Sequence, residues 1–273
     1  MAESSLVSGF FKVPAVARLT KLPRGRVLGL SVGASCFVIA FLTLVLPKDS
    51  QMAVFLLDYT KFSSFPYPFT IQNLMYLLFA VCIGELFIRS WAAKQELKFL
   101  GQHFLPEDDH SVLRAKDLGE IRQRVAHQFT ADTGILPYLI NLCILQFQAS
   151  RSVDQAVSVM NSSLDLISHK VDLNYSLTRY IVWAIPTVGF IGTVVGIANA
   201  LGFVNPDHMD LGQVTGSLSV AFNTTIIALV LSAILVLLQH IVQTSEELAM
   251  NRAGDYCLRN LINRLYVEKQ AAA

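Results

Sequence analysis

The sequence predicts an all-α polytopic membrane protein in which four transmembrane helices carry long extensions into a cytoplasmic helical domain. Hydrophobic residues make up 53% of the 273 residues and charged residues only 15%, which lies outside the range of ordinary soluble domains. Four segments lack acidic and basic side chains for long enough to cross about 30 Å of hydrocarbon. Between the second and third segments lies a long section that is too polar to enter lipid.

These observations divide the chain into nine consecutive elements. In chain order we expect a cytoplasmic N-terminal segment (1–26), a first span (27–47), an outer loop (48–61), a second span (62–88), a cytoplasmic helical domain (89–179), a third span (180–204), an outer loop (205–214), a fourth span (215–243) and a cytoplasmic C-terminal helix (244–273).

The first span has one alternative interpretation. It could be the core of a signal peptide, but its apolar run is too long and no small-residue cleavage site follows it.

Two ionisable residues stand at the ends of spans. Glu85 lies at the end of the second span and His240 at the end of the fourth, and we expect each to be an interfacial anchor within reach of water.

The distribution of Lys and Arg predicts the orientation. All of these residues except Lys48 and Lys61 lie in the N-terminal segment, the central section or the C-terminal segment. Basic residues favour the cytoplasmic side of a membrane. We therefore expect both termini and the central domain to be cytoplasmic, with two short loops outside.

The central domain has a helical pattern. Apolar residues recur at three- and four-residue spacing from Val153 to Val171, and this pattern predicts a helix that continues unbroken into the third span. The fourth span likewise runs on, through apolar residues as far as Leu265. Residues 135–147 are apolar but short and contain Asn141 and Gln146, so we expect a cytoplasmic helix there and not a fifth span.

Catalytic chemistry is poorly represented in the sequence. The six histidines show no metal-ligand spacing, and the four cysteines are scattered singly. A phosphate-binding glycine loop and a nucleophile elbow are both missing from the sequence. We expect no enzyme activity, no cofactor and no bound metal.

Small and hydroxyl residues follow one face of each of the last two spans. On the third span they are Pro186, Gly189, Thr193 and Gly196, with Gly192 and Asn199 close by, and on the fourth they are Ser217, Ala221, Thr224 or Thr225, Ala228 and Ser232. Such faces serve close helix packing, with hydroxyls bonded to the carbonyl four residues earlier. They could equally line a path that solvates an ion or a partner's carboxyl group.

A family resemblance rests on these two spans. Residues 184–201 contain the proline, the GxxGTVxGI pattern of residues 189–197 and Asn199, and they resemble the penultimate span of the MotA/TolQ/ExbB proton-channel family. Residues 217–229, SLSVAFNTTIIAL, resemble the last span of that family, with Thr225 at the position of its threonine. The remainder of the chain is similar only in layout.

The resemblance implies an ion-driven motor or stator subunit of the bacterial inner membrane. Five copies would surround two copies of a single-span partner that carries one membrane aspartate, and the flow of H⁺ or Na⁺ would drive mechanical work. Thr193 and Thr225 would line the ion path beside that aspartate, with Thr224 and Asn199 as further lining residues. Pro186 would supply a helix irregularity.

Two features depart from parts of the family. Tol and Exb relatives have an acidic residue where this chain has Val220, and they have three spans whereas four are expected here. The choice between protons and sodium, and the machine that is driven, stay open. One alternative is a non-conducting scaffold that oligomerises through Gly192 and Gly196. The other is a secondary transporter, which four spans without an internal acid disfavour.

Overall fold

The computed structural model describes residues 23–48, 50–59, 65–108, 111–125, 133–204 and 210–266. Within these residues all regular elements are helices. Leu113 and Leu265 form an isolated β-bridge that belongs to no strand. Four helical runs are long and apolar enough to cross a membrane: Arg24–Val45, Ile71–Leu100, Val153–Gly202 and Leu211–Arg264. The chain is therefore a multi-pass membrane protein, and the number of spans agrees with the prediction.

The chain divides into two compact units. The membrane unit comprises Leu22–Ser90 and Leu173–Gln243, which contain most of the apolar helical sequence. The polar unit is built from the described residues of Trp91–Asp172 and Thr244–Ala273. The helices α3 (Ile71–Leu100) and α8 (Leu211–Asn260) contribute residues to both units.

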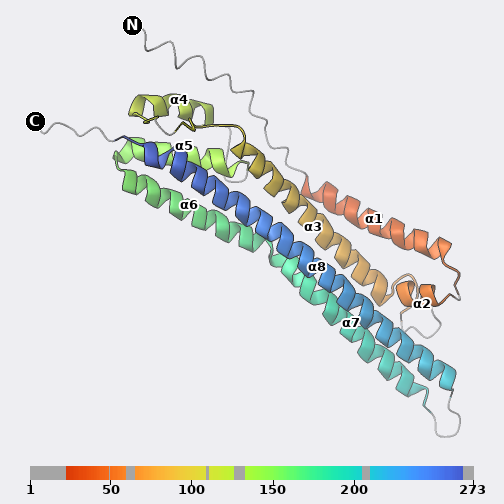
Figure 1. Cartoon of the computed structure of the whole chain (residues 1–273). Helices are drawn as coiled ribbons and strands as arrows, with labels where there is room; N and C mark the ends of the chain where they lie inside the picture. Colours follow the sequence, from red (N-terminus) through yellow and green to blue (C-terminus); the bar gives the residue numbers. More distant parts are fainter. Residues whose placement is uncertain are drawn as a thin grey trace, which may run out of the picture. The chain divides into compact units, whose positions relative to one another are not determined.

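In the membrane unit, α1 (Arg24–Val45) lies beside α3 (Figure 1). The two helices meet at Gly84, where an added Cβ would lie 2.6 Å from the Ser31 hydroxyl oxygen. Next to this contact, Arg24 Nε donates to Glu85 Oε1 at 2.6 Å, and Glu85 is only 3% exposed. We expected Glu85 within reach of water. It is instead buried, and the guanidinium group at the start of α1 compensates its charge.

Helix α2 (Gln51–Leu57) is a short helix that we did not predict in the outer loop. The Ser50 hydroxyl caps it by accepting a hydrogen bond from the backbone N–H of Met52 at 3.2 Å. The Tyr76 hydroxyl of α3 donates to the Leu56 carbonyl at 3.0 Å, which joins the end of α2 to α3.

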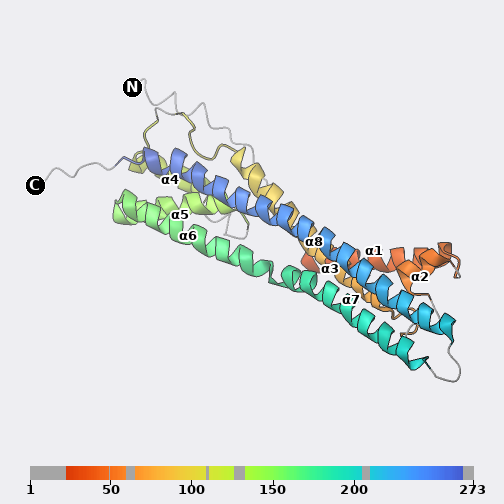
Figure 2. The same ribbon diagram turned by 60° about the horizontal axis from the view of Figure 1, so that its bottom comes forward.

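Helix α7 (Ser176–Gly202) and the first part of α8 run side by side in both views (Figure 1, Figure 2). The helical run predicted to be continuous from Val153 is interrupted once, because Tyr175 separates α7 from α6 (Val153–Asn174). Tyr175 is fully buried, and the Arg89 guanidinium lies 5.1 Å from its ring centroid. Its ψ of −3° lies in the right-handed helical region but departs from the regular α-helical value.

The polar unit has a core of its own, built on α5 (Ile135–Ser150). Leu139, Ile140, Cys143 and Ile144 are all completely buried, as expected of a short apolar helix that lies outside the membrane. Helix α4 (Ala115–Val125) packs on α5, and Gly254 of α8 lies against Leu164 of α6.

The C-terminal helix is shorter than predicted. Helix α8 ends at Asn260, and a single 3₁₀ turn, η1 (Ile262–Arg264), follows it. The chain then pairs with Leu113, whose backbone N–H donates to the Arg264 carbonyl at 2.8 Å. The remaining predicted residues of this helix, 267–273, lie outside the described part, as do 1–22 of the N-terminal segment and 205–209 of the second outer loop.

Candidate functional site

The contact between α7 and α8 depends on three glycines of α7. A Cβ added to Gly189 would overlap the Cβ of Ala228, and one added to Gly196 would lie 2.7 Å from the Cβ of Ala221. A Cβ on Gly192 would lie 2.7 Å from the hydroxyl oxygen of Thr224. Real side chains do not approach this closely, so only glycine permits this helix separation.

Close packing brings four oxygen atoms together between the two helices. The hydroxyls of Thr193 and Thr225 are hydrogen-bonded to each other. The Thr193 hydroxyl oxygen also lies 3.1 Å from the Ala221 carbonyl and 3.4 Å from the Gly189 carbonyl. The Thr225 hydroxyl oxygen lies 3.2 Å from the Gly189 carbonyl and 3.4 Å from that of Ala221. We call these four atoms the oxygen cluster.

The oxygen cluster offers lone pairs but no charge. Its two hydroxyls supply two hydrogens, whereas its four oxygens have more acceptor positions than that. Both threonines are partly exposed at the surface of the membrane unit, so a group beside the chain can reach them. Because residues 181–202 and 211–245 contain no Asp, Glu, Lys or Arg, neither helix stretch that forms the cluster supplies a formal charge from one of these side chains.

Thr224 and Asn199 occupy different positions from the two cluster threonines. Thr224 is only 1% exposed, and its hydroxyl donates to the Ala221 carbonyl at 2.8 Å beneath Gly192. Asn199 lies further along α7 and is partly buried. The helical pattern could not distinguish Thr224 from Thr225, and the structure puts Thr225, not Thr224, opposite Thr193.

Pro186 removes one backbone hydrogen bond from α7, and a side chain of α8 supplies the missing donor. Proline has no backbone N–H, so the carbonyl of Val182, four residues earlier, lacks its helical donor. The Ser232 hydroxyl of α8 donates to this carbonyl at 3.2 Å. The sequence pattern placed Ser232 on the correct face but did not reveal its partner, since the partner is a backbone atom.

Metal-binding side chains form no cluster within the described residues. No group of three or more His, Cys, Asp and Glu side chains gathers there in a way that could hold an ion. All four cysteines are free thiols; three are buried, and Cys36 is exposed.

Comparison with known protein families gives a match. Residues 136–253 match the model of the MotA/TolQ/ExbB proton channel family. The matched segment contains all of α7, both cluster threonines and the membrane-crossing part of α8. No curated protein and no solved structure matches the chain.

Proposed function

We propose that the chain is an ion-conducting motor subunit. The premise is the match of residues 136–253 to the model of the MotA/TolQ/ExbB proton channel family. The family implies a proton channel role in energy transduction. In our proposal five copies surround two copies of a single-span partner, and ion flow between them is converted into mechanical work.

The oxygen cluster is the observation that carries this proposal. Two helix stretches without acidic, Lys or Arg side chains, 181–202 and 211–245, meet at two hydroxyls and two carbonyls, and the hydroxyls are partly exposed. Neutral oxygens can replace part of the hydration shell of H⁺ or Na⁺, and the hydroxyls can donate to a carboxylate. The ionisable group that a transport pathway normally requires would be an aspartate of the partner.

The same proposal includes location and orientation. The concentration of Lys and Arg outside the loops 48–61 and 205–214 supports cytoplasmic termini in a bacterial inner membrane. The polar unit, which holds the ends of α3 and α8, would then be cytoplasmic. Its exposed charged residues, such as Glu120 on α4, would be available to contact the driven machine.

Substitution of the cluster threonines tests the proposal. Valine has nearly the shape of threonine but lacks the hydroxyl, so Thr193→Val and Thr225→Val should each lower ion flux at least about tenfold, which corresponds to about 1.4 kcal/mol. The flux is measured in vesicles that contain this chain and its partner. Thr193→Ser and Thr225→Ser should retain activity because they keep the oxygen.

Thr187→Val is the matched control. Its hydroxyl is also on α7 and bonds to the Trp183 carbonyl at 2.9 Å, but it lies outside the cluster. Native mass spectrometry of each variant must show an unchanged assembly. Normal flux in both valine variants of an intact assembly would contradict the role of the cluster.

The scaffold alternative predicted contacts between subunits through Gly192 and Gly196. Gly192 and Gly196 face Thr224 and Ala221 of the same chain, so they are already occupied by packing within the subunit. A non-conducting scaffold would have to oligomerise through other surfaces, and it would tolerate both valine substitutions.

A further inference from the structure

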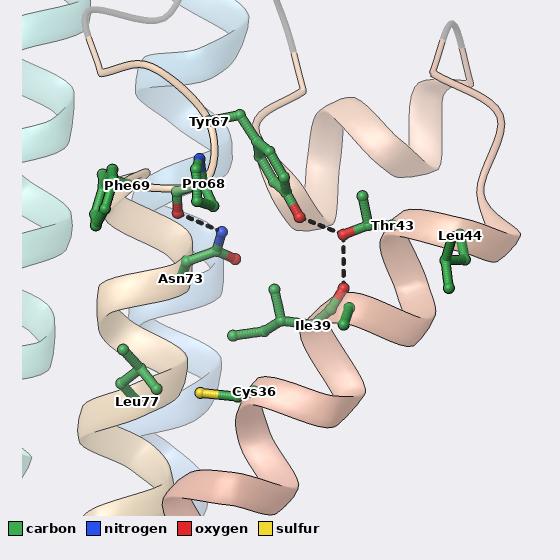
Figure 3. A pocket seen from close by; sticks show the side chains of 10 residues that line it. Cys36, Ile39, Thr43, Leu44, Tyr67, Pro68, Phe69, Asn73 and Leu77 are labelled. Carbon is green, nitrogen blue, oxygen red and sulfur yellow. Dashed lines mark hydrogen bonds between the residues drawn. The ribbon is translucent and has the colours of Figure 1, made fainter.

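An apolar groove separates α1 from the beginning of α3 in the membrane unit. Its volume is about 600 Å³, and its walls are almost entirely carbon. Figure 3 shows Cys36, Ile39 and Leu44 of α1 on one side and Leu77 of α3 on the other. Both helices are long and apolar enough to cross a membrane, so lipid chains of a bilayer could reach the groove.

The outer end of the groove is polar and aromatic. The hydroxyls of Tyr67 and Thr43 are hydrogen-bonded there, and Thr43 also donates to the Ile39 carbonyl at 2.7 Å. Exposed apolar side chains flank this end, since Leu44 is 86% exposed and Phe69 is 80% exposed. This end coincides with the end of α1 and the start of α3, where aromatic residues favour the membrane interface.

Asn73 presents an acceptor that no described residue satisfies. Its Nδ2 donates to the Pro68 carbonyl at 2.8 Å, but its Oδ1 has no hydrogen-bond partner. Asn73 is 5% exposed and lines the groove, and Figure 3 shows Oδ1 directed toward the space between α3 and α1. A buried acceptor without a partner is costly, so a ligand that carries a donor would be favoured.

A cation lies close to the same end of the groove. The Lys48 ammonium is 5.5 Å from the ring centroid of Tyr59, and that ring is 4.8 Å from the ring of Tyr67. Tyr67 itself lines the groove. A negatively charged group at the outer end would therefore meet a complementary charge.

We propose that this groove binds one phospholipid molecule. One acyl chain lies between α1 and α3, the phosphate lies near Lys48, and a hydrogen-bond donor of the headgroup reaches Asn73 Oδ1. The apolar walls suit an acyl chain, and the unsatisfied acceptor and the nearby cation suit the donor and the phosphate at the polar end of the same lipid. The proposal does not depend on ion conduction.

Lipid retention in native mass spectrometry tests the site. The full chain is reconstituted in nanodiscs that contain equal amounts of phosphatidylethanolamine and phosphatidylcholine with the same acyl chains. Ethanolamine has N–H donors and choline has none, so the wild type should retain phosphatidylethanolamine with about fivefold preference, as expected for one hydrogen bond. Asn73→Leu should remove this preference.

Two tryptophan substitutions on α1 provide matched variants. Ala40→Trp fills the groove and should abolish retention, whereas Phe41→Trp adds a similar side chain at an exposed neighbouring position and should leave retention unchanged. Equal retention in the two variants, or no headgroup preference in the wild type, would mean annular lipid only and overturn the proposal. A change in subunit number in Ala40→Trp alone would show that a second copy covers the groove, which also overturns it.

Discussion

At the scale of single residues, the most demanding contact is that of Gly189 with Ala228. The two helix backbones approach so closely that a single methyl group on residue 189 has no space. Such contacts are typical of membrane helices, where small residues permit close packing. The distance between the oxygens of the cluster depends on this approach, since Gly189 also contributes one of the carbonyls.

Gly189→Ala should therefore destabilise the membrane unit by about 1–3 kcal/mol, the usual cost of overpacking. Thermal unfolding in detergent measures the effect. Gly202→Ala on the same helix is the control, because nothing lies within 4 Å of its added Cβ. Adding Ala228→Gly to Gly189→Ala should restore much of the lost stability, and failure to do so would mean that the methyl overlap is not the cause.

Glu96 is the titratable residue with the clearest structural role outside the membrane-crossing segments. It lies on α3 beyond the charge-free stretch, and its Oε2 accepts the backbone N–H of Ile135 at 2.9 Å at the start of α5. Gly134 at the cap position has no side chain to do so. Burial raises the pKa of Glu96 to about 7, the hydrogen bond from Ile135 lowers it, and the charge of Glu246 raises it further.

The raised pKa predicts a pH-dependent stability. Between about pH 4.5 and 7 the folded carboxyl keeps its proton while the unfolded one loses it, so stability falls as the pH rises through this window. Glu96→Gln should remove this loss and stabilise the protein at pH 8, by on the order of 1 kcal/mol. Unfolding temperatures at pH 5.5 and pH 8 measure it, with the exposed Glu247→Gln as control. An equal gain at both pH values would contradict the assignment.

The sequence predicted residue types well at this scale but not their pairing. The pattern placed Thr193 and Thr225 on small-residue faces, because helical periodicity determines which residues share a face. It could not choose between Thr224 and Thr225, since that choice depends on the rotation of α8 against α7. The carbonyls of Gly189 and Ala221 carry no signal in the sequence at all.

At the scale of helices, α7 is incomplete without α8. Pro186 leaves the Val182 carbonyl without a helical donor, and Ser232 supplies one from the neighbouring helix. A buried carbonyl that loses its donor costs about 1–3 kcal/mol. The irregularity at Pro186 therefore depends on the contact between α7 and α8.

A double-mutant cycle tests this dependence. Ser232→Ala should destabilise the protein by about 1–2 kcal/mol in the presence of Pro186 and by clearly less in a Pro186→Ala background, where residue 186 again donates to Val182. Thermal unfolding of the four proteins gives the coupling. Equal costs of Ser232→Ala in both backgrounds would show that the hydroxyl acts elsewhere.

The sequence predicted the long helices correctly, because the length of an apolar run identifies a span. It did not predict a short helix or a break of one residue. The four long charge-free segments have the length of spans, and all four correspond to helical runs that can cross a membrane. Helix α2 was missed because its seven residues are too few for a periodic pattern. The interruption at Tyr175 was missed because it covers a single residue between two helical segments and leaves no mark in the apolar spacing.

At the scale of the whole molecule, α8 is much longer than a membrane requires. Its 50 residues extend about 75 Å, whereas hydrocarbon needs about 30 Å. Helix α1 has no buried residue among those described. A chain with so little internal contact around one of its spans is expected to complete its packing with lipid or with other subunits.

The native mass of the complex tests the assembly that we propose. Mild extraction through a tag on this chain should yield five copies together with two copies of a single-span protein. Mass spectrometry of the intact complex measures the copy numbers, and sequencing of the smaller component identifies the partner. A monomer or dimer as the sole species would contradict the assignment of Thr193 and Thr225 to an ion path.

The hydrogen bond from Ser232 to Val182 has a mechanical consequence. Helix α7 would be expected to bend at Pro186, but the donor that stabilises this point belongs to α8, and interlocked small residues hold the two helices together on the cluster side. A bend of α7 alone would break the bond and open the contact at Gly189. The two helices must therefore tilt together as one rigid pair, and a force applied to either one is transmitted to the other.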